Sequence, residues 1–261
     1  MKKKIFILLC SLVFLSNIHV SAKSPTTIEN LDKLADTALQ LTKLGRFVDA
    51  EKILEQFQEE FSEAATDTLI FSMDEIKILL TAQNEAKRAL SEINKLPEEK
   101  INKVTKLRLA VDAMHSHYQP LWTELQEPIM SAFSQIKEAV KAKDLDVYQM
   151  KLNSFLTRYS LIEPSLKIDI PVAKIQRLDA EITFIDKYRE KIMEDDTQFI
   201  QLDMLEADLQ NVFDHISEDE TDPSIWWVII TTGSIIILTL SYVGWRKYKG
   251  ETHTKQKEHN D

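Results

Sequence analysis

The sequence contains a single cysteine, Cys10, within an apolar stretch near the N-terminus. If that stretch is removed as a signal peptide, no cysteine remains, which excludes disulfides, zinc–thiolate sites and cysteine nucleophiles. The rest of the protein must then be stabilised by its hydrophobic core. Residues 23–224 provide about 200 residues, enough for one sizeable core.

Glycine is also scarce, with four residues in the chain and only Gly45 between residues 23 and 224. An average usage of about 7% would place about 14 glycines there. β-Hairpin turns and the phosphate-binding loops of Rossmann and P-loop proteins need glycine at defined positions. The shortage argues against these structures and predicts an all-α domain with short turns.

Catalytic and metal-binding motifs are missing as well, including G-x-S-x-G, H-E-x-x-H and S-x-x-K with its companion motifs. His115 and His117 are two positions apart, so on one helix they point about 200° apart and cannot share a metal ion. His215 lies near Glu218 and Asp219, either as a weak cation site or as part of an acidic linker. We expect no enzyme activity and no catalytic, cofactor-binding or metal-binding residues.

Positive charge is in deficit between residues 23 and 224, where 39 acidic residues face 24 basic ones. The resulting negative field repels nucleic acids and anionic lipid headgroups. Nucleic acid is therefore excluded as a partner, and the acidic surface is typical of a well-solvated protein.

One long apolar stretch stands out at residues 225–245, which contain no Asp, Glu, Lys or Arg. As a helix it would extend about 32 Å and match a hydrocarbon core of about 30 Å. Aromatic residues at both ends and basic residues just beyond it are typical of a membrane span with a cytoplasmic C-terminus. The predicted interface anchors are Trp226, Trp227, Tyr242, Trp245, Arg246, Lys247 and Lys249.

The N-terminus has the pattern of a secretory signal peptide. Three lysines precede the short apolar stretch 5–15, and Val20, Ser21 and Ala22 follow it, which predicts cleavage after Ala22. An uncleaved second anchor is the alternative, although this apolar stretch looks too short to span a membrane comfortably.

Together these features predict a single-pass protein of the cell membrane with its N-terminal domain outside the cytoplasm. The expected parts are a signal peptide (1–22), an all-helical extracytoplasmic domain (23–216), an acidic juxtamembrane linker (217–224), a transmembrane helix (225–245) and a short basic cytoplasmic tail (246–261).

The extracytoplasmic domain should begin with a helical hairpin. Gly45 breaks the first helical pattern, and Phe47, Ala50 and Leu54 open the next one. This turn resembles that of a tetratricopeptide repeat (TPR), in which the aromatic residue packs inward and the alanine allows close helix approach. Because no convincing second copy occurs 34 residues away, a lone helical hairpin is the alternative to a repeat array.

Further helical patterns cover residues 66–96, a segment beginning at Pro97, and residues 121–143, where Pro128 either kinks the helix or marks its start. Asp144 is a predicted N-cap for the next helix, in which Arg158 is either a buried ion-pair member or a side chain that reaches solvent. Two prolines predict an extended connection at 163–171. Residues 172–192 and 199–216 should form the last helices before the membrane.

Several segments occur together and in order: the signal peptide, LTKLGRFVDAEKILEQF, HSHYQPLW, EPIMSAF, FLTRYSLIEPSLKIDIP, and the final apolar stretch with WRKYK. In these segments, which cover nearly the whole chain, the sequence resembles the YpjB family of sporulation proteins from endospore-forming bacteria. The resemblance implies a membrane protein linked to sporulation and supplies no catalytic residues.

We therefore expect a non-enzymatic interaction or assembly factor at the outer face of the cytoplasmic membrane, with the membrane and another protein as partners. Its binding groove should lie beside the hairpin of residues 31–61. The alternative is a ligand-sensing domain, which would need a membrane partner because the 16-residue tail cannot hold a signalling domain.

Overall fold

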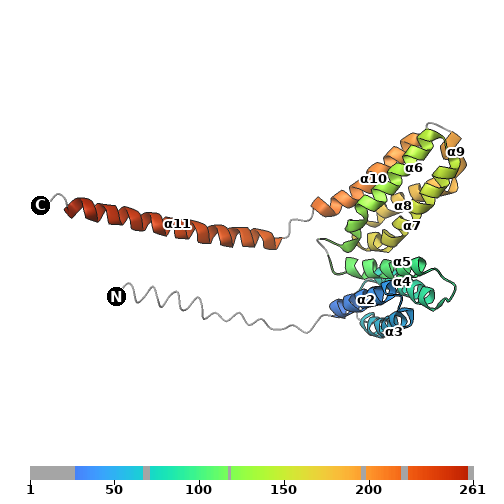
Figure 1. Cartoon of the computed structure of the whole chain (residues 1–261), viewed down its shortest axis with the longest axis horizontal. Coiled ribbons are helices and arrows are strands. Elements are labelled where there is room, and N and C mark those ends of the chain that lie inside the picture. The colour runs from blue at the N-terminus through green and yellow to red at the C-terminus, as the bar shows by residue number, and fades with distance from the viewer. Residues whose placement is uncertain (1–26, 67–70, 117–118, 195–197, 219–222, 258–261) are drawn as a thin grey trace.

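A computed structural model describes residues 27–66, 71–116, 119–194, 198–218 and 223–257. Every regular element in these ranges is helical, which confirms the all-α prediction. The predicted signal peptide lies outside them. The helices are α2 (Thr27–Lys43), α3 (Phe47–Ala64), α4 (Met73–Ser91), α5 (Pro97–Ala113), η1 (Leu121–Leu125), α6 (Gln126–Ala142), α7 (Leu145–Asp169), α8 (Val172–Lys187), α9 (Arg189–Glu194), α10 (Gln198–Glu218) and α11 (Pro223–Lys257) (Figure 1).

Helices α2 to α5 form a closed four-helix bundle. α2 packs against α3 and α5, and α4 packs against the same two helices. The rings of Phe57, Phe61 and Phe71 fill its core: Phe57 stacks on Phe61 with centroids 5.9 Å apart, and Phe61 meets Phe71 edge to face at 5.5 Å. Because each hairpin closes on the other instead of starting a stack of repeats, the tetratricopeptide likeness is limited to the first turn.

The second bundle contains η1 and helices α6 to α10, and it lies against the first one (Figure 1). α6 and α8 each contact α7 and α10, around a core with the fully buried side chains of Trp122, Phe133 and Phe155. Extensive packing of α5 against α7 joins the bundles, and Ile168 contacts both hydrophobic cores. The two bundles thus share one continuous interface.

Three helix ends follow local sequence signals. Gly45 has φ of 73°, and the N–H groups of Gly45 and Arg46 donate to the carbonyls of Thr42 and Leu41 at 3.0 and 2.9 Å. This is the Schellman ending, which favours glycine in the left-handed position. Pro97 is the first residue of α5, and the Asp144 carboxylate accepts from the Val147 N–H at 3.0 Å at the start of α7.

The helix expected at 66–96 is shorter than predicted. Ser72 and Glu75 form a reciprocal capping box, so α4 begins at Met73 and ends at Ser91. Its buried face is also different, because the expected apolar residues Met73 and Ile93 are 75% and 94% exposed. Buried alanines instead bring α4 close to its neighbours.

The predicted extended connection at 163–171 is wrong, because α7 continues through Pro164 to Asp169. A proline within a helix costs about 3 kcal/mol, since it removes a hydrogen bond and crowds the preceding turn. Here the neighbouring Ile162 and Leu166 are both 0% exposed in the core. Burying two such side chains yields about 3–6 kcal/mol, which offsets the cost of the proline.

Two other predicted helices are interrupted. Residues 121–143 divide into the 3-10 helix η1 and α6, so Pro128 lies in the first turn of α6 rather than at a kink. The pattern at 172–192 breaks at Tyr188, between α8 and α9, although Ile192 still reaches the core at 1% exposure. Of the two alternatives for Pro128 the structure thus bears out the helix start, whereas the helical spacing gave no indication of the break at Tyr188.

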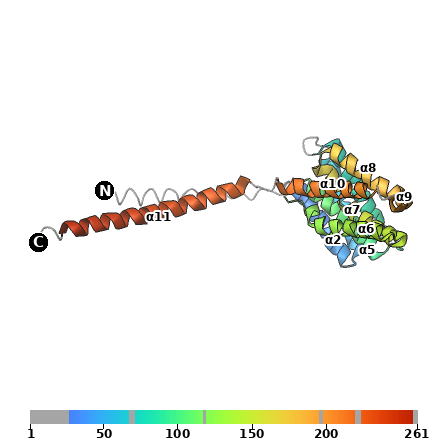
Figure 2. The ribbon, with the colours of Figure 1, turned by 90° about the horizontal axis from the view of Figure 1, so that it is seen from above.

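Helix α11 stands apart from the two bundles (Figures 1 and 2). It extends beyond the predicted span at both ends and includes most of the predicted tail. Within it, Trp227–Tyr248 is long and apolar enough to cross a membrane, and none of this segment is buried against the rest of the protein.

Candidate functional site

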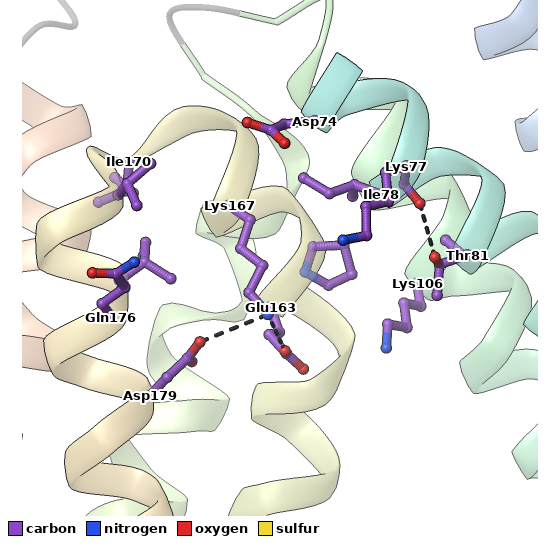
Figure 3. Close-up of a pocket in the computed structure, with 14 residues that line it drawn as sticks. Asp74, Lys77, Ile78, Thr81, Lys106, Glu163, Lys167, Ile170, Gln176 and Asp179 are labelled. Atoms are coloured by element: carbon purple, nitrogen blue, oxygen red, sulfur yellow. Dashed lines mark hydrogen bonds and ion pairs between the residues drawn. The ribbon is translucent and has the colours of Figure 1, made fainter. Parts of the chain in front are cut away.

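One concavity lies along the junction of the two bundles, and we call it the α4–α8 cleft. It has a volume of about 460 Å³, with α4 and α8 as walls and α5 and α7 contributing to its floor (Figure 3). Its lining is mostly apolar, with charged groups of both signs. The lining residues are Asp74, Lys77, Ile78, Thr81, Ala82, Lys106, Glu163, Pro164, Lys167, Ile170, Val172, Ile175, Gln176 and Asp179.

Lys167 is the central charged group of this cleft, and it connects α7 to α8. Its ammonium group contacts the Glu163 carboxylate at 2.5 Å and that of Asp179 at 3.6 Å (Figure 3). Burial alone lowers the pKa of Lys167, but the two carboxylates outweigh it and hold that pKa above its usual value. Lys167 therefore stays protonated at neutral pH and is unsuited to act as a base.

Asp179 also accepts a hydrogen bond of 2.9 Å from the Tyr159 hydroxyl. Burial, and then the negative charge of Asp179, raise the pKa of Tyr159 well above its usual value. Tyr159 thus remains a neutral donor, and the ion-pair network fixes α7 against α8 on one side of the cleft.

The opposite wall offers charged groups that are free to bind. Lys77 and Asp74 form no ion pair within the described part of the chain. Lys106 lies deeper and contacts Glu85 at 3.6 Å. Burial by itself raises the pKa of Glu85, but Lys103 and Lys106 outweigh it and hold the pKa below its usual value. The cleft can thus accept an apolar group flanked by charges of either sign.

A second cluster of polar groups is enclosed between the bundles, away from this cleft. Asp112 is 5% exposed, and its carboxylate accepts from the Leu121 N–H at 2.6 Å and the Ser116 hydroxyl at 3.2 Å. The indole N–H of Trp122 donates to Asp169 at 2.6 Å. These bonds link the ends of α5 and α7 to η1.

Asp169 in this cluster titrates unusually. Burial raises the pKa of Asp169 to about 7, with a further contribution from the negative charge of Asp112, while the hydrogen bond from Trp122 acts in the opposite direction. Its carboxylate accepts a hydrogen bond from the Trp122 indole, and Asp169 does not line the α4–α8 cleft. We therefore assign Asp169 to the joint between the bundles, which Asp112, Trp122 and Asp169 form.

Arg108 balances the acids on the first-bundle side of the joint. Its guanidinium lies 2.7 Å from Asp32, 3.7 Å from Asp36 and 3.5 Å from Asp112. Burial raises the pKa of Asp32 above its usual value even though Arg108 favours the ionised form. One arginine thus serves three carboxylates and holds α2 against α5.

The predicted membrane anchors all fall in α11. The side chains of Trp227, Tyr242 and Trp245 are 70%, 54% and 60% exposed, and Arg246 and Lys247 follow on the exposed helix surface. For Trp226 and Lys249 the structure describes the helical backbone only. The predicted cleavage site at Ala22 lies outside the described residues.

The predicted hairpin residues differ in burial. Ala50 and Leu54 are 0% exposed in the first core. Phe47, expected to be buried against the first helix, is half-buried: it packs against the first core, and its ring lies 4.6 Å from the Lys100 ammonium. The binding groove expected beside this hairpin is occupied by α4 and α5, which close the bundle.

Sequence patterns missed the residues that build the cleft and the joint. Lys167 and Asp179 come together only because α7 continues as a helix through the segment that proline had marked as extended. Asp112 and Asp169 are far apart in sequence and gave no local signal. Groups of three or more potential metal ligands are absent from the described ranges.

Comparison with known proteins bears directly on this architecture. Residues 28–258 match the family described as "Sporulation protein YpjB (SpoYpjB)". The chain is 34% identical over 259 residues to a Bacillus subtilis (strain 168) protein described as "Uncharacterized protein YpjB", and the match covers 98% of both chains. No solved structure matches this chain. The match along nearly the whole chain confirms the resemblance, and the protein belongs to the sporulation protein YpjB family.

Proposed function

We propose that this protein is a single-pass, membrane-anchored assembly factor for sporulation, which binds another protein through a helical domain outside the cytoplasm. The main support for this proposal is the contrast in apolar burial between α11 and the two bundles. The bundles bury their own apolar side chains, whereas the apolar surface of α11 finds no cover in the chain. Soluble monomers rarely leave so large an apolar surface in water, and a bilayer would cover it.

The proposed orientation depends on Arg246 and Lys247, which follow the apolar segment and favour a cytoplasmic C-terminus. We expect a cysteine at Ser62, exposed on α3, to react with a membrane-impermeant thiol reagent in intact cells. A cysteine at Thr254 should react only after the cells are permeabilised. Labelling of position 254 but not 62 in intact cells would reverse the proposed topology.

The partner surface that we propose is the α4–α8 cleft. Its largely apolar surface and mixed charges suit a protein segment that presents an apolar side chain between charged residues of both signs. The proposed role is non-enzymatic, because Lys167 and Tyr159 are held in their protonated forms by the contacts described above.

Crosslinking from the cleft tests the interaction. Thr81 lies in the wall of the cleft and Thr37 lies on α2, away from it; both are exposed, and their hydroxyls donate to carbonyls one turn earlier at 2.8 and 2.7 Å. We expect a photoreactive amino acid at position 81, in the full-length protein in sporulating cells, to capture a discrete protein adduct. The same substitution at position 37 is the matched control and should not capture it.

Equal capture from both positions, or none from position 81, would contradict the cleft as the partner surface. A ligand-sensing domain is the second candidate, favoured by the volume of the cleft and by the free charges of Lys77 and Asp74. It predicts that a small molecule, rather than a protein, protects position 81 from modification.

A further inference from the structure

A second concavity, which we call the α6–α7 pocket, lies between two neighbouring helices of the second bundle. It has a volume of about 130 Å³. Ser131 and Gln135 are one turn apart on α6, while Lys151, Ser154 and Arg158 occupy one face of α7. All five side chains can donate hydrogen bonds, and no carboxylate lines the pocket.

The positive charge of this pocket is not neutralised within the described chain. Arg158 is exposed and has no carboxylate partner there, in contrast to the other arginines of the two bundles. Lys151 donates to the Gln135 side-chain oxygen at 2.7 Å and likewise has no acidic partner in those ranges. The arginines paired with carboxylates are Arg46, Arg88, Arg108, Arg177 and Arg189.

The lack of an acidic partner for Arg158 and Lys151 is informative because acidic residues outnumber basic ones in the chain, 42 to 32. Every other described arginine of the two bundles pairs with a carboxylate, whereas Arg158 and Lys151 share one small pocket without any. The Gln135 oxygen holds Lys151 in place and leaves the amide nitrogen of Gln135 free to donate. The pocket thus presents several donors, and no hydrogen bond engages the Arg158 guanidinium within the described chain.

We propose that the α6–α7 pocket binds a phosphate group, with Arg158 forming paired hydrogen bonds to two oxygens and Lys151 supplying a second charge. The hydroxyls of Ser131 and Ser154 and the amide of Gln135 donate to the remaining oxygens. A tetrahedral dianion can use this many donors, whereas a carboxylate has only two oxygens. This site is separate from the α4–α8 cleft and does not depend on the proposed partner.

The phosphate group can come from a soluble phosphate ester or from an anionic lipid headgroup. Titration of the full-length protein with inorganic phosphate, in maltoside micelles that contain no phosphate, tests the site by calorimetry. We expect saturable binding that Arg158→Gln and Lys151→Gln each weaken about 10-fold or more, since a hydrogen bond to a charged group is lost in each case. Arg88→Gln, which removes another exposed helical arginine, should leave the affinity unchanged.

No saturable binding up to about 10 mM phosphate, or equal affinity in Arg158→Gln, would overturn the proposal. Circular dichroism of each variant should match that of the parent, which separates lost binding from lost folding. Phosphatidic acid added to the micelles distinguishes the sources. If it competes with inorganic phosphate the site accepts a headgroup, and if it does not compete the site accepts a soluble phosphate; both results support the site.

Discussion

Replacing Trp122 with alanine should destabilise the two bundles by about 3–5 kcal/mol, the usual range for a buried tryptophan. Trp122 is 0% exposed, its ring lies 5.4 Å from that of Phe213, and its N–H donates to Asp169. The substitution leaves a cavity where η1 meets α10 and removes the donor to a buried carboxyl group. In thermal unfolding of the full-length protein in micelles, we expect Tm to fall by roughly 10 °C or more.

Two further variants separate the contributions to this effect. Trp122→Phe keeps most of the ring volume but loses the N–H group, so it should retain much of the stability and isolate the hydrogen bond. Trp227→Ala is the matched control, because Trp227 is 70% exposed on α11. If Trp122→Ala lowered Tm no more than Trp227→Ala does, the packing described for the joint would be wrong.

Asp169→Asn should have the opposite effect and stabilise the protein at pH 8. The pKa of Asp169 is about 7 in the folded protein, against about 3.9 in an unfolded chain. Between these values the folded state holds a proton that the unfolded state has lost, so the stability of the parent protein falls as the pH rises. Asparagine keeps an oxygen that accepts from Trp122 and carries no charge, so it avoids this loss.

We expect the advantage of Asp169→Asn to be small near pH 4, to grow through pH 7 and then to level off at about 2–4 kcal/mol. Urea unfolding at pH 4, 6 and 8, followed by circular dichroism, measures this profile. Glu138→Gln, which neutralises an exposed acid in the middle of α6, serves as the charge-matched control. An advantage for Asp169→Asn that did not vary with pH would show that Asp169 does not titrate near neutrality.

Both variants act on the joint between the bundles, which the chain crosses between α5 and η1. Asp112 and Asp169 come from separate helices and meet around Trp122, so stability there depends on charge as well as on packing. The α4–α8 cleft lies along the same interface between the bundles.

Local signals in the sequence were sufficient for much of the secondary structure. The shortage of glycine predicted an all-α protein, and Pro97 and Asp144 marked helix starts that the structure confirms. Such signals are reliable because a cap or an N-terminal proline acts within one turn, whatever lies farther away. The turn at Lys143 carried no glycine signal, yet its φ is 51°, and the N–H groups of Lys143 and Asp144 donate to the carbonyls of Val140 and Ala139 at 3.0 and 3.2 Å in the same Schellman pattern.

The sequence by itself determined the helical class, the apolar segment of α11 and most positions that face a core, since each follows from composition or from helical spacing. Tertiary structure alone decided that α7 continues through Pro164, that the first hairpin closes into a bundle, and that Lys167 meets Asp179. The physical reason is that burying residues such as Ile162 and Leu166 against other helices lowers the free energy of the folded state enough to offset the local cost of the proline. The unpaired charge of Arg158 is likewise a property of its surroundings, because only the folded chain shows which cations have no carboxylate within reach.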